Sequence, residues 1–293
     1  MMRGGGLARW IAIGAVSVLA VLVGVVAMTA YERVHTATPT GQMAPAPTFT
    51  LGVRTPTPTP TGEAALPTDQ QRFLAIGETQ WWRATAGACG GRAPVIERSS
   101  DAGATWIAVT PNYLGIERVL TLNAFTGADA EVVAGVAGCN AQALRTYTRG
   151  QFWESYPDVL TASRFVDPKD AASIHLATAT VPAPCGASSG LHAQGDVIAL
   201  VCDGRAWSWT GTVWEQLAPE SAIAVAIDGG EVVVAHAEHE CAGVALSRVA
   251  PAGAAKPVAI GCAAAVDADA ALAIDVTGAD VVVWSGDELV FVQ

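Results

Sequence analysis

Apolar and polar positions along most of the chain follow the pattern of short β-strands. Runs rich in β-branched residues end at Gly, Asp or Pro, as strands and hairpin turns require; they lie at residues 131–136, 196–201, 231–235 and 280–284. After residue 70 no stretch of ten or more residues has helical periodicity, apart from a weak turn expected near residues 167–172. The pattern therefore predicts an all-β domain over residues 71–293.

The N-terminus has a different pattern, a continuous apolar run over residues 10–30. Its 21 residues are about the length that spans a bilayer core as a helix. Arg3 and Arg9 precede it, which favours a cytoplasmic N-terminus. A cleavable signal peptide is the alternative, but its apolar region is usually only about 7–15 residues long. We expect a cytoplasmic tail at residues 1–9 and an uncleaved signal anchor at residues 10–31, with the membrane as its partner.

A Pro- and Thr-rich linker, residues 32–70, separates this anchor from the β domain. Seven of the 16 prolines lie between residues 35 and 70, and residues 55–61 alternate strictly between Thr and Pro. Proline prevents strand pairing and favours extended polyproline geometry, so the segment predicts a semi-rigid stalk. The β domain is then expected to lie outside the cytoplasm.

One turn of the β domain is more specific than the rest. Residues 99–106 read SSDAGATW, in which the turn-forming positions are Ser99, Asp101, Gly103, Thr105 and Trp106. Asp101 can accept hydrogen bonds from its own turn, and Gly103 can adopt the positive φ of tight hairpins. The segment resembles the Asp-box of sialidase-like β-propellers, S/T-x-D-x-G-x-T-W. The resemblance implies a propeller, with the turn as a folding device on an outer hairpin.

Together, the anchor, the stalk and the Ala/Val-rich acidic domain resemble exported proteins of high-GC Gram-positive bacteria.

Related turns recur beyond this segment. Glycines in similar Trp- or Pro-flanked turns follow at positions 150, 211, 253 and 286, at intervals of 47, 61, 42 and 33 residues. A four-stranded propeller blade takes about 40–50 residues. We therefore predict about five degenerate blades, with an insertion near residues 181–191 and ring closure by pairing of residues 72–84 with the strands near 289–292. A β-sandwich is the alternative fold.

All six cysteines lie in the expected extracytoplasmic part, and an even number there predicts disulfides. Their positions relative to the strand units favour three particular bridges. The expected pairs are Cys89–Cys139, Cys185–Cys202 and Cys241–Cys262.

Charge and motif composition limit the function. Residues 71–293 contain 12 Lys and Arg against 24 Asp and Glu, a net charge of −12, which argues against nucleic acid as a partner. The segment 236–241, HAEHEC, is the densest group of metal-ligand types, but it follows a strand as a polar loop would and does not match H-E-x-x-H. We expect no metal and no cofactor.

No catalytic residues can be assigned from the sequence. The early Arg-Ile-Pro motif of sialidases is missing, no arginine triad is recognisable, and Tyr113, Tyr147 and Tyr156 are the tyrosines after the stalk. The chain also lacks a G-x-S-x-G elbow. The indole pairs at positions 81–82 and at 207 and 209 form either sheet core or a sugar- or protein-binding face.

The sequence thus favours a membrane-anchored extracytoplasmic propeller that binds an envelope protein or glycan without catalysis. A chain of this kind resembles Asp-box propellers that assist the assembly of membrane complexes. The alternative is a divergent extracellular glycoside hydrolase of sialidase-like fold.

Overall fold

The computed structural model describes residues 22, 24–28, 68–252 and 256–293. The chain divides into two units, residues 1–59 and 60–293. In the first unit, residue 22 and residues 24–28 are helical. The rest of the predicted anchor and most of the stalk lie outside the described residues. Within the described residues, no helix has the length and apolar character needed to span a membrane.

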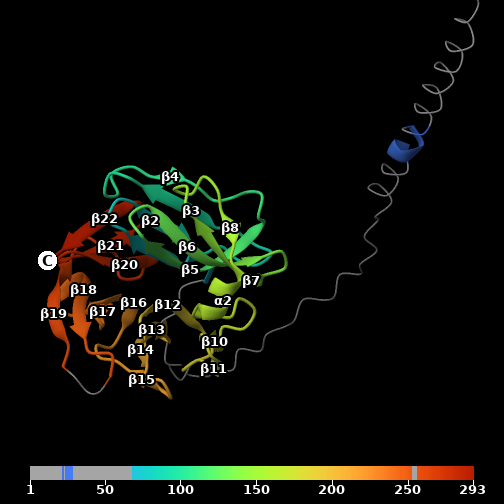
Figure 1. The fold of residues 1–293 in the computed structure, drawn as a ribbon. Coiled ribbons are helices and arrows are strands. Elements are labelled where there is room, and N and C mark those ends of the chain that lie inside the picture. Colours follow the sequence, from blue (N-terminus) through green and yellow to red (C-terminus); the bar gives the residue numbers. More distant parts are fainter. Residues whose placement is uncertain (1–21, 23, 29–67, 253–255) are drawn as a thin grey trace, which may run out of the picture. The chain divides into compact units, whose positions relative to one another are not determined.

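The second unit is a six-bladed β-propeller (Figure 1). Its sheets are antiparallel and consecutive in sequence, and four of them have four strands. Blade 1 contains β1 (Arg72–Ile76), β2 (Trp81–Thr85), β3 (Val95–Ser99) and β4 (Ile107–Ala108). Blade 2 contains β5 (Ile116–Phe125), β6 (Asp129–Val136), β7 (Asn140–Thr146) and β8 (Glu154–Ser155). Blade 4 contains β12 (Ser188–Gln194), β13 (Val197–Cys202), β14 (Arg205–Trp209) and β15 (Trp214–Gln216). Blade 5 contains β16 (Ala222–Asp228), β17 (Glu231–Glu238), β18 (Cys241–Val249) and β19 (Val258–Ala263).

The other two blades have three strands each. Blade 3 contains β9 (Phe165–Val166), β10 (Ser173–His175) and β11 (Thr180–Pro182), and blade 6 contains β20 (Leu272–Thr277), β21 (Asp280–Ser285) and β22 (Glu288–Val292). The prediction of about five blades was therefore wrong. The 61-residue interval between glycines 150 and 211 contains the whole of blade 3, which has no Gly-Trp turn of its own. The insertion expected near residues 181–191 consists of strand ends from blades 3 and 4 and the loop between them.

The predicted ring closure by strand pairing was also wrong. β1 pairs with β2 and β22 pairs with β21, so blades 1 and 6 are separate sheets. Side chains join them instead, because β1 lies beside β20 and the Arg72 guanidinium donates to the Gly286 carbonyl at 2.6 Å. The ring is closed by packing and polar contacts between blades.

The apolar runs seen in the sequence are the second strands of the blades. Such a strand is covered on both faces by adjacent blades, so both alternating sets of side chains are buried. In β17, for example, Val232, Val233 and Val234 are all fully buried. The unit has a short 3-10 helix, η1 (Thr68–Gln70), and one described α-helix, α2 (Pro157–Ala162), which was not predicted. Residues 167–172 form a non-helical turn rather than the weak helical turn that was expected. The Asp167 carboxylate holds this turn by accepting from the amides of Lys169 and Asp170.

Candidate functional site

The turn at residues 99–106 connects β3 to β4 and is held by its own side chains. The Asp101 carboxylate accepts from the Thr105 amide at 2.9 Å, and the Ser99 hydroxyl accepts from the Gly103 amide at 2.8 Å. Gly103 has a φ of +86°. Hydrogen bonds from Ser99 and Thr105 lower the pKa of Asp101 to about 2. The polar side chains are used within the turn, so this segment is a structural device.

A second turn with the same geometry lies in blade 2, at residues 146–153. The Thr146 hydroxyl accepts from the Gly150 amide at 2.9 Å, and the Thr148 hydroxyl accepts from the Phe152 amide at 2.8 Å. Thr148 thus takes the position of the aspartate, and the φ of Gly150 is +79°. The sequence had indicated this turn only by its glycine and tryptophan. Gly286, in contrast, lies between the second and third strands of blade 6 and is not equivalent, and residue 253 lies outside the described residues.

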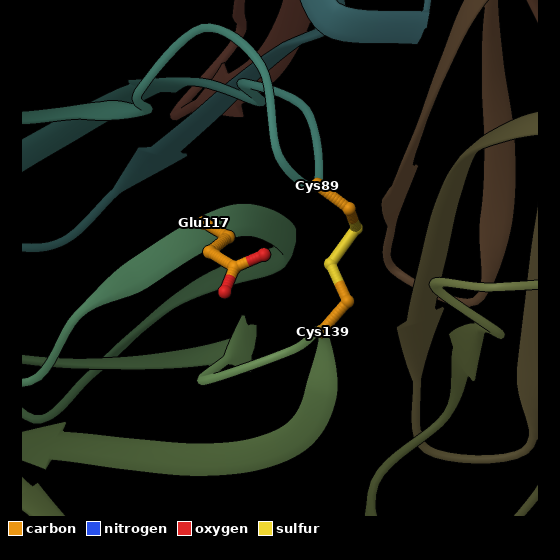
Figure 2. A group of neighbouring side chains, drawn as sticks. All are labelled: Cys89, Glu117 and Cys139. Atoms are coloured by element: carbon orange, nitrogen blue, oxygen red, sulfur yellow. A yellow bond between two sulfur atoms is a disulfide. The ribbon is translucent and has the colours of Figure 1, made fainter. Parts of the chain in front are cut away.

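The three disulfides are those expected from the sequence: Cys89–Cys139, Cys185–Cys202 and Cys241–Cys262. Such bridges are typical of extracellular domains. Figure 2 shows the first of them beside Glu117. These three residues are the one group of potential metal ligands found close together within the described residues, but the two sulfurs are bonded to each other.

The segment 236–241 does not gather into a metal site within the described residues. His236 is buried in β17 and its Nε2 lies 3.0 Å from the Ser247 hydroxyl. Cys241 is oxidised with Cys262, and residues 239 and 240 are exposed between β17 and β18.

The tryptophan pairs are mainly core. Trp82 is fully buried and meets the Trp153 ring edge-on at 6.0 Å, and Trp81 is also buried. Trp207 and Trp209 are half-buried against the core of blades 3 and 4.

A cavity of about 360 Å³ lies where α2 faces the inner strands β1, β5 and β12. We refer to it as the α2 pocket. Its apolar lining residues come from α2 and the inner strands; its polar and charged lining residues are Thr121, Asn123, Glu131, Arg145, Asp158, Ser163, Arg164 and His192. Its size is within the range of ligand-binding cavities.

Three of the polar lining residues, Asn123, Glu131 and Arg145, form a row across one face of blade 2. Cross-strand pairing places Asn123 opposite Glu131, Glu131 opposite Arg145, and Arg145 opposite Glu154. The Arg145 guanidinium donates to Glu131 Oε2 from Nε at 2.8 Å and from Nη2 at 2.6 Å. Partial burial lowers the pKa of Arg145, but hydrogen bonds and charge interactions with Glu131 and Tyr147 together outweigh this effect and raise it. No hydrogen bond within the described part of the chain engages Glu131 Oε1, which is free to accept one from a ligand.

An aromatic shelf, formed by Phe125, Tyr147 and Tyr156, continues the same face of blade 2. The residues lie two positions beyond Asn123, Arg145 and Glu154, so alternation puts them on the same side of the sheet. The Arg145 guanidinium lies 4.9 Å from the Phe125 ring and 5.9 Å from the Tyr156 ring. Tyr147 is 53% exposed and meets both other rings edge-on at about 6 Å. The shelf thus presents open aromatic surface beside a fixed ion pair.

The sequence missed this site for a clear reason. Glu131 and Arg145 are 14 residues apart and come together only through the register of β6 and β7. Tyr147 and Tyr156, to which the sequence assigned no role, lie at the end of this same face. The alternation of side chains along the hairpin of β6 and β7 is the one sequence pattern that could have placed these residues on the same face.

A second cavity, of about 330 Å³, is lined by the inner strands of five blades, so it is the central channel. His192 lines both this channel and the α2 pocket, and desolvation lowers its pKa to about 4. Burial raises the pKa of Asp275 to about 6. The Asp275 carboxylate accepts from the Ile76 amide at 2.6 Å and from the Val276 amide at 2.8 Å, so it links blade 6 to blade 1.

No protein-family model and no curated protein sequence matches the chain. Several solved structures resemble its fold at low identity. YCF48 bound to D1 peptide is 13% identical, with a TM-score of 0.44 over 75% of this chain and 76% of that one. A lectin of Aleuria aurantia is 11% identical, with a TM-score of 0.43 over 75% of this chain and 90% of that one. A Trypanosoma rangeli sialidase is 8% identical, with a TM-score of 0.37, and the match spans 75% of this chain and 53% of the sialidase. A fold by itself does not determine a function.

Proposed function

We propose that this chain is a membrane-anchored extracytoplasmic binding protein whose propeller holds a ligand in the α2 pocket. The observation that supports the proposal is the Glu131–Arg145 pair beside the aromatic shelf. The Glu131–Arg145 pair, held in one geometry, would orient a polar ligand. The exposed aromatic rings offer contact area at a low cost in conformational entropy. The apolar run at residues 10–30 and the three disulfides favour the anchored, extracytoplasmic location.

Binding is favoured over glycoside hydrolysis by how the carboxylates are used. Hydrolysis needs a protonated acid that can reach the leaving-group oxygen and a second carboxylate across the bond. Glu131 is held in an ion pair with Arg145, and the Asp275 carboxyl, whose pKa is raised, accepts from the amides of Ile76 in blade 1 and of Val276 in its own strand. Neither geometry fits the acid of such a pair. The turn at residues 99–106, on this proposal, is an Asp-box that supports the fold.

Site-specific photo-crosslinking in the producing cells tests the proposal. A benzophenone side chain at Asn123, which is exposed in the α2 pocket, is expected to capture a defined envelope component. The same probe at Val213, 55% exposed on the outer turn of blade 4, is the control. Arg145→Met should abolish the Asn123 product while leaving the amount of folded protein unchanged. Equal capture from both positions would contradict the proposal. So would hydrolysis of aryl glycosides that is lost on substitution of one pocket carboxylate.

A further inference from the structure

Blade 6 ends its sheet at the third strand and leaves one strand edge open. Among the described strands, β22 pairs with β21 alone, from Ser285–Glu288 to Val281–Val292. Since a two-residue turn joins the strands, Ser285 and Glu288 form a hydrogen-bonded pair. Alternation then directs the amide and carbonyl of Leu289 and of Phe291 away from β21. No hydrogen bond within the described part of the chain engages these four groups.

Blade 3, the other three-stranded sheet, closes its edge in two ways. Its third strand, β11, ends in Pro182, which has no amide to donate. The Trp214 indole donates to the Pro182 carbonyl at 3.0 Å. Natural proteins protect sheet edges by such devices. β22 has none of them over Leu289–Val292, which contains no proline and no charge.

The unpaired edge of β22 is apolar and lies between two blades that have a fourth strand. Blades 1 and 5 on either side have fourth strands, β4 and β19, whereas blade 6 stops one strand earlier, about 4.8 Å in a sheet. On this strand, Phe291 is 50% exposed and its ring lies 6.0 Å from the Trp81 ring. One missing strand between two four-stranded blades favours an extended segment as the occupant over a second folded propeller.

We propose that β22 is a strand-addition site for an extended segment of a partner protein. The main chain of that segment would pair with Leu289 and Phe291 as the fourth strand of blade 6. Its side chains would be apolar on the face that they share with Leu289 and Phe291. Asp287 and Glu288 lie at one end of the edge, so a basic residue after the apolar run of an antiparallel segment would meet them.

Hydrogen exchange of the full chain with a synthetic probe tests this directly. The probe is the acetylated peptide VTVTVKK, and the control is VTPTVKK, whose proline interrupts pairing. Without peptide, the amides of Leu289 and Phe291 should exchange rapidly, while that of Val290, bonded to β21, is protected. Saturating VTVTVKK should slow the two outer amides about tenfold or more, and the control should not.

Two variants at one position separate backbone pairing from ring contact. Phe291→Pro removes an amide that β21 does not use, so the sheet should remain and peptide binding should be lost. Phe291→Val keeps the amide and should retain binding, weakened by about tenfold or less. Equal loss in both variants would overturn strand addition. Protection of the outer amides before any peptide is added would overturn it too, and dependence of that protection on protein concentration would identify a second copy as the occupant.

Discussion

Replacement of Arg83 tests how the propeller ring is held closed. The Arg83 guanidinium lies 4.3 Å from the Trp106 ring and 4.9 Å from the Trp284 ring, and Trp284 belongs to blade 6. Its Nε also donates to the Glu97 carboxylate at 2.7 Å. The Arg83 side chain is only 11% exposed, so these contacts are weakly screened. Arg83→Met keeps apolar volume but removes the charge.

The expected loss of stability follows from these contacts. Two desolvated cation–π contacts contribute about 1 kcal/mol each. The Glu97 carboxylate, 23% exposed, would lose its cation at a cost of about 1–3 kcal/mol. The substitution also removes Arg83 Nη1, a donor that is buried without a hydrogen-bond partner in the described structure. This removal offsets part of the loss of stability. We expect a net loss of about 3 kcal/mol, or about 6–12 °C in Tm for a domain of this size.

Urea unfolding with the disulfides intact measures this loss. Arg92→Met is the control, because Arg92 is 65% exposed and 3.9 Å from Asp69, a pair worth about 0.5 kcal/mol or less. Adding Glu97→Gln to Arg83→Met should restore about 1 kcal/mol or more, since no buried carboxylate is then left unpaired. A cost below about 1 kcal/mol for Arg83→Met, or purely additive losses in the double variant, would refute the assigned role.

Further predictions concern a turn, a buried acid and a disulfide. Gly103→Ala should destabilise by about 1–3 kcal/mol more than Gly211→Ala in urea unfolding: both glycines have positive φ, but only at Gly103 would the new methyl overlap another side chain. Between about pH 4 and 6 the native Asp275 binds more protons than the unfolded one, so stability falls as pH rises; Asp275→Asn should flatten this slope in melting curves, and an unchanged slope would contradict the assignment. Replacing both Cys89 and Cys139 by Ala should cost about 4 kcal/mol, against about 3 for removing the bridge that spans 17 residues; equal costs would argue against a chain-entropy origin.

Local sequence patterns determined the fold class of this protein and the form of its individual turns. The β-branched runs predicted central strands because a blade buries both faces of such a strand. The turn at residues 99–106 was predictable because Ser99, Asp101 and Gly103 lie within five positions and act on each other. Cysteine positions relative to the strands likewise gave the three bridges.

Only the tertiary structure decided the blade number, the closure of the ring and the candidate site. Blade 3 was missed since its short strands have no Gly-Trp turn, and closure depends on contacts such as Arg83 with Trp284, about 200 residues apart. The α2 pocket depends on register, which brings Glu131 to Arg145, and on an unpredicted helix. Strand propensity and turn geometry depend on residues that are neighbours in the sequence. Pairing register and packing between blades depend on contacts around the whole ring.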